Sequence, residues 1–146
     1  MDRALEVADF QPDEVKRIVG RITKDEDFYS FIKYYFNFFE NIFNVIAKNK
    51  GIDPKDLKIL DIGCGTGAYL QTFNHLGYNH LYGMEIDETS HQSLAELIKH
   101  DKLDKIKVTN TNIYDKNLIE KLDQNFNNTK FDVVLLICTL EHFSNP

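Results

Sequence analysis

The sequence lacks the features that direct a chain to a membrane or to an oxidising compartment. No stretch approaches the roughly 20 consecutive apolar residues of a membrane-spanning helix. A charged start followed by an apolar run, typical of a signal peptide, is also missing. Cys64 and Cys138 are the only cysteines, and their spacing matches no zinc site. We therefore expect a soluble cytoplasmic protein with two packed thiols, no disulfide and no metal centre.

The chain has no excess of basic residues. It carries 23 acidic side chains against 17 Lys and Arg, for a formal net charge of −6. Proteins that bind nucleic acids usually present a basic face, so this balance disfavours RNA or DNA as a partner. The one short basic cluster fits the solvated face of a helix; it contains Lys16, Arg17, Arg21 and Lys24.

A glycine-rich stretch is the most informative part of the sequence. An apolar run contains Asp61 near its end, and Gly63, Gly65 and Gly67 follow at every second position. This pattern predicts a strand, a tight turn and the start of a helix, whose free amides can face a ligand. The dinucleotide fingerprint G-x-G-x-x-G has a different spacing. An acid placed before the glycines would also repel a pyrophosphate, whereas it suits a ligand with an ammonium group.

This stretch resembles motif I of class I S-adenosylmethionine-dependent methyltransferases, which reads hydrophobic-Asp/Glu-x-Gly-x-Gly-x-Gly. The resemblance implies that S-adenosylmethionine is the cofactor and S-adenosylhomocysteine the product. It also implies that Asp61, Gly63, Cys64, Gly65 and Gly67 bind this cofactor. An NAD-dependent oxidoreductase remains an alternative, against which the glycine spacing and the acid both count.

The sequence after residue 51 alternates between strand-like and helix-like patterns, which predicts a parallel α/β sheet. The fourth apolar run is nearly continuous, as expected for a strand buried on both faces. The resemblance implies a Rossmann-like sheet whose first four strands lie in the order 3-2-1-4, with helices before it. The expected strands are 58–62, 80–85, 106–110 and 131–137, and the expected helices are 67–76, 88–100 and 116–126.

Ligands of open α/β sheets lie at the carboxyl ends of the strands, so the residues that end each strand are candidates for the site. Glu85 ends the second strand, 18 residues after Gly67. In the methyltransferases that this chain resembles, an acid here binds both ribose hydroxyls, and the next apolar residue, Ile86, packs on adenine. Asp87 is the alternative ribose ligand, although an Asp at this place also suits the N-cap of the next helix.

The third strand leads to Asn112 and Ile113, which the resemblance places beside the adenine. The family usually has an Asp where Asn112 stands, and an amide oxygen can accept the same hydrogen bond from the adenine amino group. Asp115 is an alternative acceptor, and a plain loop role is another.

The residues after the fourth strand resemble the "LEH" segment of ubiquinone, menaquinone and related small-molecule methyltransferases. The resemblance implies a small-molecule methyl acceptor, and backbone contacts from Cys138 and Thr139 to the methionine part of the cofactor. His142 is the candidate general base, since a histidine with an ordinary pKa of about 6.5 accepts a proton at neutral pH. An orienting hydrogen bond or a contact to the cofactor is the alternative role for His142. The Asn-Pro-Pro-Tyr signature of amino-group methylation is absent.

Residues 1–51 form a predicted helical lid or docking segment, and residues 52–146 form the predicted cofactor-binding domain. Residues 25–49 repeat apolar and aromatic side chains at three- and four-residue steps, and Gly51 follows as a stop signal. A shorter helix is expected from Val15. The long helix either packs on the sheet or roofs an acceptor pocket.

The resemblance also sets an expectation about completeness, because the family's sheet has seven strands in the order 3-2-1-4-5-7-6. We expect this chain to be the amino-terminal part of a longer enzyme. One alternative is a short form completed by a second chain, for example a homodimer that pairs along the exposed edge of strand four. The other alternative is a non-catalytic module that binds the cofactor or a protein partner.

Overall fold

The computed structural model describes the backbone of residues 26–143 and the side chains of residues 36–143. The short helix expected from Val15 lies outside the described residues. The long predicted helix is α2 (Glu26–Lys50). The next residue, Gly51, has a left-handed conformation with φ of 68°. Glycine adopts this conformation without a steric penalty, which explains why the helix ends there.

Within residues 26–143, four parallel strands form the sheet, in the order β3-β2-β1-β4. The predicted strand order is therefore confirmed. The bounds of the first three strands also match the prediction; the four strands are β1 (Lys58–Ile62), β2 (His80–Glu85), β3 (Ile106–Asn110) and β4 (Val133–Leu135). The prediction of a strand over 131–137 was too long, because the chain turns at Ile137 and Cys138, where Cys138 has φ of 51°.

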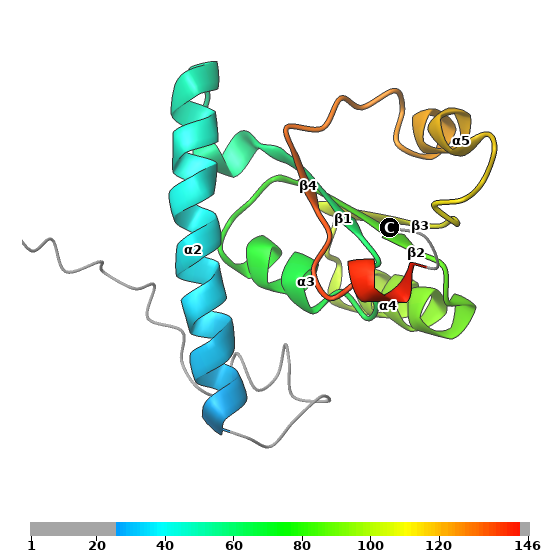
Figure 1. The fold of residues 1–146 in the computed structure, drawn as a ribbon, viewed down its shortest axis with the longest axis horizontal. Helices are drawn as coiled ribbons and strands as arrows, with labels where there is room; N and C mark the ends of the chain where they lie inside the picture. Colours follow the sequence, from blue (N-terminus) through cyan, green and yellow to red (C-terminus); the bar gives the residue numbers. More distant parts are fainter. Residues whose placement is uncertain (1–25, 144–146) are drawn as a thin grey trace, which may run out of the picture.

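Helices cover both faces of the sheet. On one side α2, α3 (Ala68–His75) and α4 (Glu88–Asp101) contribute to one apolar cluster with the sheet, and α5 (Leu118–Asn125) packs on the other side (Figure 1). Side chains of each strand alternate between the two faces, so Ile59 and Leu81 join the first cluster whereas Leu60 and Tyr82 join the second. This is a three-layer arrangement with the sheet in the middle.

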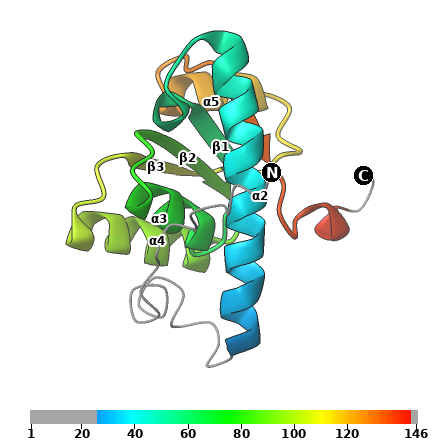
Figure 2. The ribbon, with the colours of Figure 1, turned by 90° about the vertical axis from the view of Figure 1, so that its left-hand side faces the viewer.

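Aromatic side chains attach α2 to helix α3. Phe36, Phe39 and Phe43 are buried at steps of three and four residues, so they lie on one face of the helix. Their ring centroids lie 5.1, 6.0 and 5.4 Å from that of Phe73 on α3. Figure 2 shows α2 running along this side of the molecule. The part of α2 with described side chains thus packs into the core, and a role as the roof of an acceptor pocket stays a prediction.

Strand β4 lies at an edge of the described sheet, beside β1. Val133 and Leu135 are buried, whereas Val134 is 49% exposed. The prediction that this strand is buried on both faces was therefore wrong for Val134, because no described element covers the outer face of β4 at this position. No helix within residues 26–143 has the length and apolarity that crossing a membrane requires.

Candidate functional site

A cavity of about 360 Å³ opens at the carboxyl edge of the sheet. The parallel registers bring the ends of all four strands to this edge, so each following loop contributes to the wall. The lining residues are Ile62, Gly63, Met84, Glu85, Ile86, Thr111, Asn112, Ile113, Tyr114, Cys138, Thr139, His142 and Phe143.

Eight of the twelve site residues predicted from the sequence line this cavity. They come from all four strand ends: Gly63, Glu85, Ile86, Asn112, Ile113, Cys138, Thr139 and His142. The structure leaves four predicted residues off the wall, and each lies within the glycine-rich stretch: Asp61, Cys64, Gly65 and Gly67. A larger hollow of about 860 Å³ lies beside α5 and contains only Ile113 of the predicted set, so we place the site in the smaller cavity.

The glycine loop uses the conformational freedom of its glycines. Gly63, Gly65 and Gly67 have φ of 73°, 53° and 79°, which residues with a side chain rarely adopt. A Cβ on Gly67 would lie 2.6 Å from a methyl carbon of Leu94, so this glycine also allows α3 to pack against α4. Cys64 points into the core, where its buried thiol belongs to the apolar cluster. The Cys64 side chain is therefore turned away from the cavity, and only its backbone is available to a ligand.

Glu85 connects the glycine loop with the loop after β2. Its Oε2 accepts a hydrogen bond from the Gly65 amide at 2.7 Å, and its Oε1 accepts one from the Asp87 amide at 2.8 Å. The residue is 7% exposed and lines the cavity. Each carboxylate oxygen has two lone pairs, so each can accept one more hydrogen bond from a ligand. Glu85 thus fixes the shape of the glycine loop and remains able to bind a diol.

Asp61 lies beneath the same loop and is 2% exposed. Burial, together with repulsion from the Glu85 carboxylate, raises the pKa of Asp61 to about 7. Burial, Asp61 and Glu85 also raise the pKa of the Cys64 thiol well above its usual range. Burial and the Glu85 charge therefore disfavour the ionised form of Asp61, and a cationic group near the loop would favour it.

Asp87 caps helix α4. Its carboxylate accepts a hydrogen bond from the Ser90 amide at 2.8 Å, and hydrogen bonds from Ser90 hold the pKa of Asp87 below its usual value. Asp87 does not line the cavity. Of the two acids considered for the ribose, only Glu85 therefore lies on the cavity wall.

Replacing Asp87 by Ala tests this separation of the two acids. We expect Asp87→Ala to lower the free energy of unfolding by the small amount typical of a lost N-cap, because α4 loses its N-cap hydrogen bond. The affinity for S-adenosylhomocysteine should stay within twofold, since the backbone amide that donates to Glu85 is retained. Denaturant unfolding and calorimetric titration measure the two effects, and a large loss of affinity would transfer the ribose role to Asp87.

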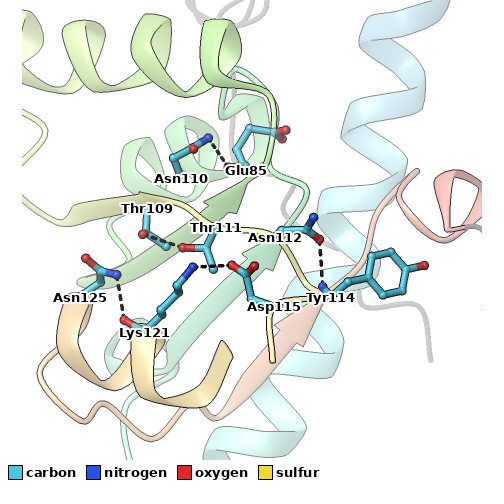
Figure 3. A network of polar contacts seen from close by, with 9 residues as sticks. All are labelled: Glu85, Thr109, Asn110, Thr111, Asn112, Tyr114, Asp115, Lys121 and Asn125. Carbon is cyan, nitrogen blue, oxygen red and sulfur yellow. Dashed lines mark hydrogen bonds and ion pairs between the residues drawn. The ribbon is translucent and has the colours of Figure 1, made fainter. Parts of the chain in front are cut away.

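The loop after β3 is ordered by side-chain hydrogen bonds, which Figure 3 shows. Asn112 Oδ1 accepts a hydrogen bond from the Tyr114 amide at 2.9 Å, which forms a local turn. Asn110 Nδ2 donates to the carbonyl oxygen of Glu85 at 2.9 Å and so ties β3 to the end of β2. Asp115 points toward Lys121 and pairs with it at 2.7 Å, and it does not line the cavity, which removes the alternative acceptor from the site.

Five residues of the wall were not predicted from the sequence: Ile62, Met84, Thr111, Tyr114 and Phe143. Two of them are aromatic. Tyr114 and Phe143 pack edge to face, with ring centroids 5.9 Å apart, and join the loop after β3 to the end of η2 (Leu140–His142). They follow predicted site residues by one or two positions, which is the only signal that would have found them. An isolated aromatic residue after a strand is otherwise typical of core packing.

His142 and Cys138 both lie on the segment after β4. His142 is exposed, lines the cavity and ends the short η2 helix. Cys138 is a free thiol, as expected, but it is exposed. The expectation of two packed thiols was thus wrong for Cys138, because its left-handed backbone turns the chain toward the cavity. No group of three potential metal ligands occurs among the residues with described side chains.

Comparison with known proteins relates this fold and site to one family. The family's sequence model, described as a methyltransferase domain, matches residues 31–146. The mitochondrial ubiquinone biosynthesis O-methyltransferase of Dictyostelium discoideum is 29% identical over 96 residues. That match covers 62% of this chain and 28% of the relative.

Solved structures show the same fold at low sequence identity. The plantazolicin methyltransferase BpumL, in complex with a pentazolic desmethylPZN analogue and SAH, aligns with 93% of this chain at a TM-score of 0.51 and 21% identity. WbdD aligns with 87% of this chain at a TM-score of 0.56 and 15% identity. The aligned parts amount to 46% of BpumL and 25% of WbdD, so this chain spans less than half the length of these proteins.

Proposed function

Because this chain belongs to the methyltransferase-domain family of class I fold, we propose that it binds S-adenosylmethionine and takes part in methyl transfer to a small molecule. The observation that carries the proposal is the position of Glu85. Its carboxylate is held by the Gly65 and Asp87 amides at the cavity wall, with lone pairs left for the two hydroxyls of a ribose.

The remaining wall offers partners for the other parts of this cofactor. Ile86 is 61% exposed and Ile113 lies on the wall of the same cavity, so the two side chains provide apolar surfaces for an adenine ring. Asn112 Oδ1 already accepts one hydrogen bond, and its second lone pair or its Nδ2 group can bond to the polar edge of adenine. Cys138 and Thr139 line the wall on the β4 side, where we place the methionine part of the cofactor.

Asp61 matches the charge of the same ligand. The methionine part of the cofactor carries an ammonium group, and a buried carboxylate with a pKa of about 7 gains stabilisation from a nearby cation. A pyrophosphate would have the opposite effect, because its negative charges would add to the repulsion between Asp61 and Glu85. The electrostatics of the loop therefore favour S-adenosylmethionine over a dinucleotide.

S-adenosylmethionine supplies an activated methyl group on a sulfonium, so the protein mainly has to position the acceptor. His142 lies at the cavity wall on an exposed turn, where it can reach an acceptor that enters from solvent. We assign it the role of accepting the acceptor's proton. Tyr114 and Phe143 provide an aromatic boundary next to it, which suits an acceptor with an apolar body.

A side chain on Gly65 would test how closely the ligand approaches the loop. We expect Gly65→Ala to weaken binding of S-adenosylhomocysteine about tenfold, because a Cβ would point into open space at the loop residue whose amide binds Glu85. Gly77→Ala is the matched control: both glycines have positive φ, and a Cβ added to either would meet no heavy atom within 4 Å. If both variants lose similar stability and only Gly65→Ala loses affinity, the result supports a ligand bound at the glycine loop. If the two variants bind S-adenosylhomocysteine equally well, the result contradicts it.

Thermal denaturation with a panel of ligands tests the proposed function without knowledge of the acceptor. At a ligand concentration of 100 times Kd, binding to a single site adds about 2.7 kcal/mol to the free energy of unfolding, which raises Tm by roughly 5–11 °C for a domain of this size. We expect this shift with S-adenosylmethionine and S-adenosylhomocysteine and no shift with NADH. A shift with NADH alone would assign the chain to dinucleotide chemistry. Binding without transfer to any acceptor would favour a non-catalytic module.

A further inference from the structure

We propose that Thr139 is a positioning residue whose side chain clamps the segment after β4 onto the glycine loop and so holds the cavity in its binding shape. The inference rests on the proposed function for its ligand, and on side-chain contacts for its geometry. Thr139 is 8% exposed although it lies in an irregular segment at the edge of the sheet.

The hydroxyl group of Thr139 provides the first half of the clamp. Its Oγ1 lies 3.0 Å from the carbonyl oxygen of Ile62, the last residue of β1, and 3.0 Å from that of Ile137. The hydroxyl proton can be donated to either oxygen. The contact to Ile62 joins segments 77 positions apart in the sequence. It lies at the point where the chain leaves β1 and enters the glycine loop.

The same side chain packs directly against Gly63. A Cβ on Gly63 would lie 2.6 Å from Thr139 Cγ2 and 2.7 Å from Thr139 Oγ1, closer than real Cβ contacts allow. The Gly63 amide also donates to the carbonyl oxygen of Met84 at 2.7 Å, so the glycine cannot move away without breaking this bond. Gly63 and Thr139 therefore form one continuous piece of the cavity wall.

The backbone of Thr139 extends the clamp to His142. The Thr139 carbonyl oxygen accepts a hydrogen bond from the His142 amide at 3.0 Å and so starts the η2 turn. The preceding residue, Cys138, has φ of 51°, a conformation that a side chain disfavours and that the surrounding contacts must hold. The Thr139 contacts to β1 thus fix both the turn at Cys138 and the position of His142 relative to the glycine loop.

Two variants separate the hydroxyl group from the shape of the side chain. Thr139→Val keeps the size of the side chain and removes the donor, whereas Thr139→Ser keeps the donor and removes the methyl group. We expect Thr139→Val to weaken S-adenosylhomocysteine binding about tenfold, and Thr139→Ser to stay within threefold of the wild type. Equal affinities of all three proteins, or equal losses in both variants, would overturn the proposal. Failure of the folded wild type to bind would instead contradict the proposed function.

A double-mutant cycle tests the clamp without any ligand. We expect Gly63→Ala to lower Tm by about 5 °C more than Gly77→Ala, since both changes strain a positive φ but only the first clashes with a neighbour. In a Thr139→Ala background this excess should largely disappear, because the two nearest atoms, Thr139 Cγ2 and Oγ1, are gone and only Thr139 Cβ at 3.2 Å remains. Additive effects of Gly63→Ala and Thr139→Ala on Tm would overturn the clamp whatever the cofactor is.

Discussion

Replacing Asp61 by Asn is expected to stabilise the unliganded protein while it removes most of the cofactor affinity. In the folded chain the pKa of Asp61 is raised from 3.8 to about 7. Because the folded state holds the proton more tightly than the unfolded state, the contribution of Asp61 to the free energy of unfolding is greatest below pH 4. It falls as the pH rises to about 7 and is constant at higher pH. One pKa unit corresponds to about 1.4 kcal/mol. Asp61→Asn removes the cost of ionising this buried group, but the buried amide still has unsatisfied polar atoms. We therefore expect the free energy of unfolding to rise by on the order of 2 kcal/mol at pH 8.

Binding should change in the opposite direction. The wild-type affinity for S-adenosylhomocysteine should increase between pH 6 and pH 8 as Asp61 ionises and can compensate the ligand's ammonium group. Asp61→Asn should bind about 100-fold more weakly at pH 8 and lack this pH dependence. Denaturant unfolding and calorimetric titration at several pH values measure both effects. Asp104→Asn, which removes an exposed acid, is the control and should change neither. A destabilised Asp61→Asn with normal affinity would contradict the account.

Replacing Glu85 by Gln is expected to be as harmful as replacing it by Ala. The two Glu85 oxygens each face a backbone N–H group, from Gly65 at 2.7 Å and from Asp87 at 2.8 Å. An amide has only one oxygen, so its NH₂ group would face one of these donors, and the loop would have to open. We expect Glu85→Gln to weaken S-adenosylhomocysteine binding about 100-fold, because the charged acceptor and the loop geometry are lost together.

The control for this variant is Glu88→Gln, the same chemical change in the exposed first turn of α4. Its affinity should equal that of the wild type, as measured by calorimetric titration. If Glu85→Gln retained more than a third of the wild-type affinity, the carboxylate would not be the ribose acceptor. The site would then have to be built on the backbone of the glycine loop alone.

Much of the fold was predictable because its signals are local. The strands β1, β2 and β3 begin and end where apolar runs, glycines and helix-capping residues change the pattern, and the structure confirms these bounds. The order of the strands followed from the resemblance, which rests on the spacing from Asp61 to Gly67. The short β4 was not predictable in this way, because the turn at Cys138 depends on contacts of Thr139 with β1 rather than on a turn residue.

Most residues of the candidate site could be predicted from the sequence, but the contacts among them could not. Glu85 and Asn112 could be selected because each follows or forms the end of a strand. That Glu85 already binds the Gly65 amide, and that Asn112 already binds the Tyr114 amide, depends on loop conformations that no spacing rule contains. The high pKa of Asp61 likewise arises from burial and from a neighbour on another strand. Tertiary proximity, which a sequence pattern does not encode, decides these properties.

Calorimetric titration of this 146-residue chain with S-adenosylhomocysteine at pH 8 shows whether the cavity binds the cofactor. We expect micromolar binding with one ligand per chain, since the glycine loop, Glu85 and the β4 segment already form a cavity of about 360 Å³. NADH titrated under the same conditions should give no heat of binding. A chain that is folded by circular dichroism yet binds no S-adenosylhomocysteine would contradict the claim that these four strand ends form a cofactor site.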